Sequence, residues 1–315
     1  MKKKILITGG NGFIGKALNK KLIQNNYFVK ISSRKKEFNS KNLFTTYRTG
    51  EIDGKTKWDK ILDNIDCVVH CAAITSNMNK DEGETTESFR KVNIEGTINL
   101  ARQSASMGVK RFIFLSSIKV NGEKTFNNSS FKYYDIPNPS DNYSNSKWIA
   151  EQELIKISNS TNLELIIIRS PLVYGPGAKG NFKRLINVIK TNMPLPLAMV
   201  QNQRSMIGIE NLIDLLIQCI DHPKASGKIF LASDGEDLST SELIKLIASS
   251  MGRKANLFPF PISILKFLGS VLGKREEINR LVGSLRIDNS YTKQILNWTP
   301  PVSVEEGIRR MVQGK

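Results

Sequence analysis

The most constraining feature of this chain is a glycine-rich turn between a short apolar run and a helical pattern. Residues 8–15 read Thr-Gly-Gly-Asn-Gly-Phe-Ile-Gly and directly follow the apolar run 5–7, which places glycines at Gly9, Gly12 and Gly15. Glycine lacks a Cβ, so the backbone can turn sharply and approach a pyrophosphate closely. The following helix directs its N-terminal N–H groups and the positive end of its dipole at such an anion. The turn therefore predicts a dinucleotide-binding site, although its G-x-x-G-x-x-G spacing differs from G-x-G-x-x-G.

Strand-like and helical stretches alternate through the first 232 residues. We expect strands at 5–7, 28–32, 43–47, 66–70, 111–115, 163–168 and 228–232, and helices at 13–25, 58–62, 88–107, 143–158 and 210–220. Almost wholly apolar runs such as 165–168 are typical of a parallel sheet that is covered on both faces. The pattern predicts an α/β fold with a Rossmann-like, doubly wound parallel sheet.

The chain changes in character after residue 170, where prolines and glycines become frequent. We expect a dinucleotide-binding Rossmann domain formed by residues 1–170 and 205–232. A smaller, partly discontinuous α/β domain, formed by residues 171–204 and 233–315, would close over it and bind substrate. Within it, residues 261–273 could be an amphipathic helix that touches a membrane surface, but we expect a helix that covers the core.

Composition narrows the location and the partners. The formal charge of +17 could attract nucleic acid, an anionic substrate or an anionic membrane face, but no basic motif is interleaved with aromatic residues. We therefore expect solvated basic faces and no nucleic-acid partner. Three cysteines without a C-x-x-C pair are typical of a reducing cytoplasm, and no run of 18 apolar residues indicates insertion into a membrane. Two isolated histidines predict no metal site.

A tyrosine and a lysine carry the predicted chemistry. Tyr143 and Lys147 are four residues apart, so they share one face of the helix expected there. A nearby ammonium group should lower the tyrosine pKa from about 10, which suits general acid–base catalysis. Ser117 ends a strand at its carboxyl edge, where a hydroxyl can hold a substrate oxygen. We expect His70, inside a strand, to be structural.

Several further motifs in the same order complete a resemblance. They are His70-Cys71-Ala72-Ala73, Asn93-Ile94-Glu95-Gly96, Leu115-Ser116-Ser117, Arg169-Ser170-Pro171 through Tyr174-Gly175-Pro176, and Trp298-Thr299-Pro300. With the glycine turn and the tyrosine–lysine pair, the chain resembles the extended short-chain dehydrogenase/reductases, the NAD-dependent epimerase/dehydratase group that acts on nucleotide sugars.

The resemblance implies a role for each matching residue. The catalytic residues would be Ser117, Tyr143 and Lys147, with Asn93 supporting Lys147. Cofactor contacts would come from Gly9, Asn11, Gly12, Phe13, Ile14, Gly15, Ser33, Arg34, Glu51, Ile52, Ala72, Ala73, Asn93, Tyr143, Lys147, Ser170 and Pro171. The UDP-sugar would contact Ser117, Asn181, Leu195, Leu197 and Arg204. The resemblance also implies a homodimer formed through the helices near 88–107 and 143–158.

The choice of cofactor and the reaction stay open. NAD-specific sites place an acid at the end of the second strand, where this chain has Ser33, Arg34 and Lys35. Arg34 favours NADP, with NAD as the alternative. This favours a 4-keto reductase acting at C4 of a UDP-hexose in polysaccharide precursor synthesis. A UDP-hexose 4-epimerase and a non-catalytic cofactor-sensing protein are the alternatives. Asn121 stands where the family's epimerases commonly have tyrosine, so this chain departs from the family at a position where substrate contacts are expected.

Overall fold

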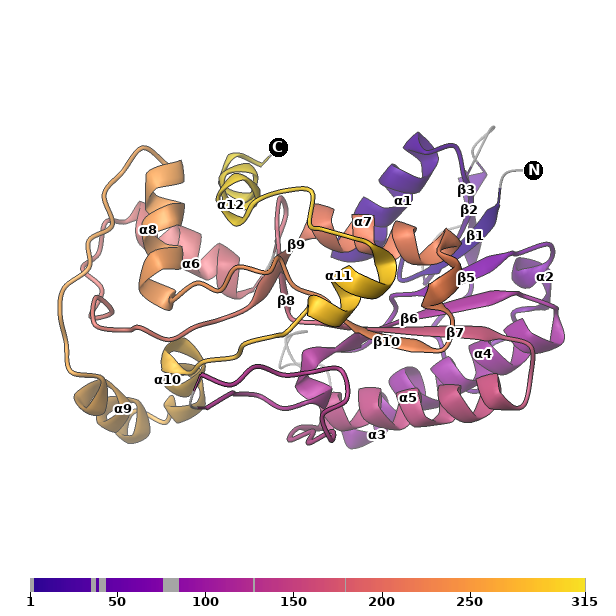
Figure 1. The fold of residues 1–315 in the computed structure, drawn as a ribbon, viewed down its shortest axis with the longest axis horizontal. Helices are drawn as coiled ribbons and strands as arrows, with labels where there is room; N and C mark the ends of the chain where they lie inside the picture. Colours follow the sequence, from indigo (N-terminus) through magenta and orange to yellow (C-terminus); the bar gives the residue numbers. More distant parts are fainter. Residues whose placement is uncertain are drawn as a thin grey trace.

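A mostly parallel sheet forms the centre of the N-terminal part of the molecule (Figure 1). The computed structural model describes residues 3–34, 38–39, 44–75, 85–126, 128–178 and 180–314. The eight strands lie in the order β10-β7-β6-β5-β1-β2-β4-β3, and β3 pairs antiparallel with β4 whereas the other neighbours pair in parallel. Their bounds are Lys4–Thr8 (β1), Phe28–Ser33 (β2), Phe38–Asn39 (β3), Phe44–Arg48 (β4), Cys67–His70 (β5), Arg111–Ser117 (β6), Glu164–Ser170 (β7) and Lys228–Leu231 (β10).

Helices cover both faces of this sheet. Because side chains alternate along a strand, Ile5 and Ile7 enter one core while Leu6 enters the other. The first core includes side chains from α1 (Phe13–Gln24), α7 (Ile209–Asp221) and α11 (Ser290–Leu296). The second includes side chains from α2 (Asp59–Leu62), α4 (Thr97–Ser106) and α5 (Asn142–Asn159). The predicted doubly wound α/β fold is confirmed.

The strand order places a crevice beside the end of β1. The chain continues from β1 to β2 on one side, and its other neighbour, β5, lies on the opposite side. In open α/β sheets, ligands bind at the carboxyl ends of the strands where the strand order reverses in this way. The glycine turn after β1 and the segment 71–75 after β5 both reach this position.

The C-terminal part has its own core beside the sheet. β8 (Leu172–Tyr174) pairs in parallel with β9 (Met206–Gly208). Its helices are α6 (Asn181–Lys190), α8 (Thr240–Ser250), α9 (Ile262–Val271), α10 (Arg275–Val282) and α12 (Val304–Gln313). Helix α9 lies at the lower left in Figure 1, with α10 between it and the sheet-containing part. The searched residues contain no helix with the length and apolar character needed to cross a membrane.

Two local features differ from the sequence-based expectations. The helix expected at 88–107 consists of α3 (Thr86–Phe89), a π-helical stretch (Arg90–Gly96) and α4. The end of the chain is divided, since Leu296 and Trp298 enter the first sheet core whereas Val304 and Ile308 enter the C-terminal core. The proposed division into two domains stays a prediction, with α11 on the sheet side.

Candidate active site

The glycine turn has no room for larger residues. Gly9 has φ +69°, and a Cβ there would lie 2.8 Å from the Ala72 nitrogen. A Cβ on Gly15 would lie 2.2 Å from the Gly9 carbonyl oxygen. The Gly12 N–H closes the turn by donating to that carbonyl at 2.8 Å. Close backbone packing therefore requires glycine at positions 9 and 15, whereas a Cβ on Gly12 would lie 3.1 Å from the Gly9 carbonyl oxygen. The predicted approach of this turn to a pyrophosphate stays a prediction.

The start of α1 fits a diphosphate. Gly12 caps the helix without a side-chain hydrogen bond, and the first turn holds no acidic residue. The amides of Phe13 and Ile14 thus belong to a helix end whose N–H groups lack intrahelical acceptors. A turn that brings backbone N–H groups and a positive dipole end to the crevice suits the pyrophosphate of a nicotinamide dinucleotide.

The end of β2 would border the adenosine side of such a ligand. Ser33 is buried, and the Asn11 carboxamide donates to its hydroxyl at 2.9 Å. Arg34 is exposed, and Lys35 lies outside the described residues. Ile52 is a core residue, whereas Glu51 is exposed with Lys91 Nζ 3.4 Å from its carboxylate.

Two further cofactor-site predictions lie at strand ends. After β5, the Ala72 N–H donates to the Thr8 hydroxyl at 3.3 Å, and Ala73 follows it, half-buried. After β7, Ser170 and Pro171 are buried, and the Ser170 hydroxyl donates to the Pro171 carbonyl at 3.2 Å. The sheet therefore brings both segments to its carboxyl edge.

Tyr143 lies in the first turn of α5, which Asp141 caps through a reciprocal capping box with Ser144. The phenol is half-buried, and its ring centroid is 6.4 Å from that of Phe89. Burial raises the pKa of Tyr143 to about 12; a hydrogen bond with Ser117 opposes this rise and the charge of Asp141 adds to it. Ser117 and Tyr143 are thus brought together as predicted, with the phenol protonated at neutral pH.

Lys147 does not lower the pKa of this tyrosine, so that expectation is wrong. The lysine is 2% exposed, and its Nζ donates to the Leu115 carbonyl at 2.9 Å while lying 4.5 Å from the Phe114 ring centroid. Burial lowers the pKa of Lys147 to about 8. The ammonium group is therefore directed at β6, and burial disfavours its charge.

Asn93 is buried on the π-helical stretch but contacts a different partner from the one expected. Its carboxamide accepts from the Ile74 N–H at 2.9 Å, and donates to the Ile74 carbonyl at 3.0 Å and to Ser146 at 2.9 Å. It therefore holds the segment after β5 against α5. Its support of Lys147 stays a prediction.

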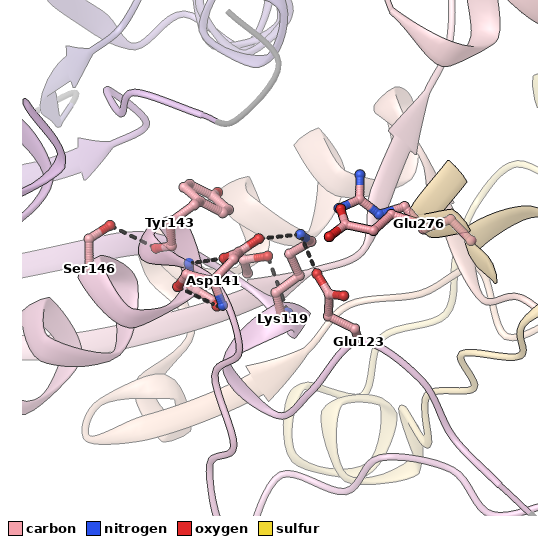
Figure 2. A network of polar contacts seen from close by, with 9 residues as sticks. Lys119, Glu123, Asp141, Tyr143, Ser146 and Glu276 are labelled. Atoms are coloured by element: carbon pink, nitrogen blue, oxygen red, sulfur yellow. Dashed lines mark hydrogen bonds and ion pairs between the residues drawn. The ribbon is translucent and has the colours of Figure 1, made fainter. Parts of the chain in front are cut away.

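A charged cluster that sequence reasoning missed lies beside Tyr143 (Figure 2). Lys119 Nζ is 2.6 Å from the Asp141 carboxylate and 2.8 Å from that of Glu123. Burial alone would raise the pKa of Asp141, but hydrogen bonds from Lys119 and Ser144 hold it below its usual value. The local signals were the four-residue spacing of Lys119 and Glu123 and the capping-box pattern at Asp141, but the contact between these two segments forms only in the folded chain.

A second missed network lies beneath the site. Glu151 and Arg169 form an ion pair at 2.6 Å with side chains 0% and 2% exposed. Glu151 also accepts from the Ser116 hydroxyl, and Arg169 donates to Asn121 at 3.0 Å. Asn121 therefore accepts a hydrogen bond from the buried arginine, and this structural contact accounts for an asparagine at this position.

The predicted substrate contacts other than Ser117 lie apart from one another. Asn181 is exposed at the start of α6, whereas Leu197 is buried in the C-terminal core and Leu195 packs against that core half-buried. Arg204 Nη1 donates to the carbonyls of Arg280 at 2.8 Å and Gly283 at 3.1 Å. That nitrogen therefore holds the end of α10.

His70 is structural, as predicted. Its ring nitrogens lie 2.6 Å from the Thr8 hydroxyl and 2.9 Å from the Thr97 hydroxyl, and burial lowers its pKa to about 3. Within the parts of the chain that were searched, no three His, Cys, Asp or Glu side chains are grouped to hold a metal ion.

The chain is similar to several known proteins. The profile of the NAD dependent epimerase/dehydratase family matches residues 5–232. A UDP-glucose 4-epimerase of Vibrio cholerae is 42% identical over 315 residues, which cover 99% of this chain and 95% of that protein. An N-acetyl-alpha-D-glucosaminyl-diphospho-ditrans,octacis-undecaprenol 4-epimerase of Escherichia coli O157:H7 is 25% identical over 327 residues, which cover 99% and 95%.

A solved structure shows the same fold. The UDP-glucuronic acid 4-epimerase of Bacillus cereus in complex with NAD superposes with a TM-score of 0.79 at 23% identity, covering 99% of this chain and 98% of that one. The chain therefore belongs to the NAD-dependent epimerase/dehydratase family and is an enzyme of the short-chain dehydrogenase/reductase type.

Proposed function

We propose that this enzyme is a UDP-hexose 4-epimerase that uses NAD. The observation that carries the proposal is 42% identity to a UDP-glucose 4-epimerase over nearly the whole of both chains. Ser117, Tyr143 and Lys147 all lie at the carboxyl edge of the sheet, which argues against a non-catalytic cofactor sensor. In this proposal these residues supply a proton-transfer group, Tyr143, in addition to a binding surface.

The earlier preference for a reductase and for NADP lacks support. Both rested on Arg34, whose side chain is exposed. The structural neighbour that shares the fold was solved with NAD. Asn11 and Ser33 present a carboxamide and a hydroxyl where the adenosine ribose would lie, and such neutral groups suit ribose hydroxyls.

Tyr143 moves the proton in this proposal, and Ser117 orients the reacting oxygen. Bound NAD would supply a positively charged nicotinamide ring, which can accept the hydride from C4 of the sugar. Because burial raises the pKa of Tyr143 to about 12, the phenol needs such a charge nearby before it can act as a base. It would then take the proton from the C4 hydroxyl and give it back after the sugar has presented its other face.

A second candidate substrate is a hexose carried on a polyprenyl diphosphate. The relative from Escherichia coli O157:H7 is named for such a substrate. Exposed apolar side chains on α9, at the outer end of the C-terminal part, favour a substrate that lies at a lipid surface (Figure 1). Both candidates share the diphosphate and the 4-epimerisation.

The remaining parts of the proposal concern assembly and location. We propose a homodimer formed through α4 and α5, supported by the exposed apolar side chains of Met107 and Ile149. Sedimentation equilibrium tests it, and a monomer at micromolar concentration would contradict it. A cytoplasmic location stays a prediction from the cysteine content.

NMR of UDP-glucose incubated with the enzyme and NAD tests the proposed reaction. We expect UDP-galactose to form, and Tyr143→Phe to lower the rate by roughly 10²–10⁴-fold because the phenol is the acid–base group. Tyr134→Phe is the matched control, since Tyr134 is an exposed tyrosine, and it should retain activity. Oxidation of NADPH with a 4-keto sugar, without any interconversion of UDP-glucose, would overturn the proposal.

A further inference from the structure

Helix α9 exposes a continuous apolar face. Ile264, Phe267, Leu268, Val271 and Leu272, which we term the outer stripe, have side chains between 42% and 69% exposed. Their spacing of three, four, seven and eight residues places them on one side of the helix. Five large apolar side chains gathered on one face of a protein mark an interaction surface rather than chance exposure.

The opposite face of α9 is anchored in the protein. Leu265 and Gly269 are buried, and a Cβ on Gly269 would lie 2.6 Å from Ile278 of α10. The two helices are therefore closely packed, which holds the outer stripe outward. The expectation that this segment covers the core is correct for one face only.

The charges next to the outer stripe are mainly positive. Lys266 lies on α9 itself, and Lys274 and Arg275 follow its end; all three are exposed. Of the two carboxylates in α10, Glu276 lies towards Lys119 and the active-site cluster (Figure 2). The protein as a whole carries a formal charge of +17. An apolar stripe with cations at its border matches an anionic lipid surface.

We propose that the outer stripe docks this enzyme on the surface of a membrane that contains anionic lipid. The apolar side chains would enter the boundary between headgroups and acyl chains, while the adjacent lysines and arginine contact the headgroups. The docking is peripheral, because the searched residues hold no helix that could cross the bilayer. Since α10 lies between the outer stripe and the Lys119 cluster, the active site would open close to the lipid surface.

Flotation of the full chain with vesicles tests this proposal, which does not depend on which UDP-sugar is the substrate. We expect binding to vesicles of phosphatidylcholine with phosphatidylglycerol, weaker binding to phosphatidylcholine alone, and loss of binding as salt rises. The variant Phe267→Ser/Val271→Ser should bind at least about tenfold more weakly, because it removes two large apolar side chains from the stripe. Lys266→Gln/Lys274→Gln should also bind more weakly, by roughly fivefold for each charge removed.

The matched control is Ile136→Ser, which removes an apolar side chain that is 89% exposed outside the stripe. It should bind vesicles like the wild type, and all variants should turn over soluble UDP-sugar at the wild-type rate. Failure of the wild type to bind anionic vesicles, or unchanged binding by Phe267→Ser/Val271→Ser, would overturn the proposal. So would conversion of a dimer into monomers by the same variant without any effect on vesicle binding, because the stripe would then be covered by a second copy.

Discussion

Replacing Lys147 by methionine should stabilise this protein while abolishing its activity. Burial lowers the pKa of Lys147 from 10.5 to about 8, which corresponds to about 3 kcal/mol by which the folded state disfavours the ammonium. The substitution also removes the hydrogen bond from Lys147 to the Leu115 carbonyl, and this loss costs about 1 kcal/mol. Lys147→Met should therefore raise the free energy of unfolding by about 2 kcal/mol near pH 7.

The gain should depend on pH in a defined direction. Because the pKa is lower in the folded than in the unfolded chain, the folded state binds fewer protons, and the penalty is complete below about pH 8. It disappears as the pH rises towards 10.5, the ordinary value for lysine. The advantage of Lys147→Met should thus shrink to nearly nothing at about pH 10.

Urea unfolding followed by circular dichroism, without dinucleotide, measures this advantage at both pH values. Lys156→Met is the matched control, since Lys156 is an exposed lysine on the same helix and should change stability by less than about 0.5 kcal/mol at either pH. A Lys147→Met variant less stable than the wild type near pH 7, or equally favoured at both pH values, would refute the reasoning. Loss of turnover in the same variant would show that the reaction needs the residue whose buried charge destabilises the fold.

Three other substitutions test separate parts of the site. Gly15→Ala would place a Cβ 2.2 Å from the Gly9 carbonyl oxygen, so calorimetry should show at least a tenfold loss of NAD affinity, and unchanged affinity would contradict the glycine argument. Glu151→Gln leaves the charge of Arg169 buried without its partner and should lower the free energy of unfolding by about 3–5 kcal/mol in urea; a loss below about 1 kcal/mol would show that the pair is dispensable. Arg34→Ala removes an exposed side chain, so fluorescence titration should find NAD affinity within about twofold of the wild type, and a large loss would show that Arg34 does bind the dinucleotide.

Local sequence patterns predicted the elements that local patterns determine. The apolar runs of β1, β5, β6 and β7 have a strong signature, because a sheet covered on both faces requires apolar strands. The glycine turn has one too, because close backbone packing excludes larger residues there. Strands β8 and β9 have three residues each, too few for a periodic pattern. Their pairing joins segments more than 30 residues apart and arises only in the folded chain.

The candidate site shows the same limit. The spacing of Tyr143 and Lys147 correctly placed both on α5, but the direction of the lysine depends on the Leu115 carbonyl of β6, which spacing does not reveal. The partners of Asn93 and the ion pair of Glu151 with Arg169 likewise depend on which elements pack together. Sequence reasoning therefore placed the candidate reactive groups on the elements that carry them and missed the contacts that set their charges.

The fate of a deuterium label at C4 of UDP-glucose tests the central claim most directly. If Tyr143 moves the proton while the hydride stays with one enzyme molecule, UDP-galactose should form with the label retained at C4 and with no net consumption of dinucleotide. Recovery of unchanged labelled UDP-glucose, together with stoichiometric oxidation of NADPH when a UDP-4-keto-hexose is supplied instead, would contradict the epimerase and support a reductase.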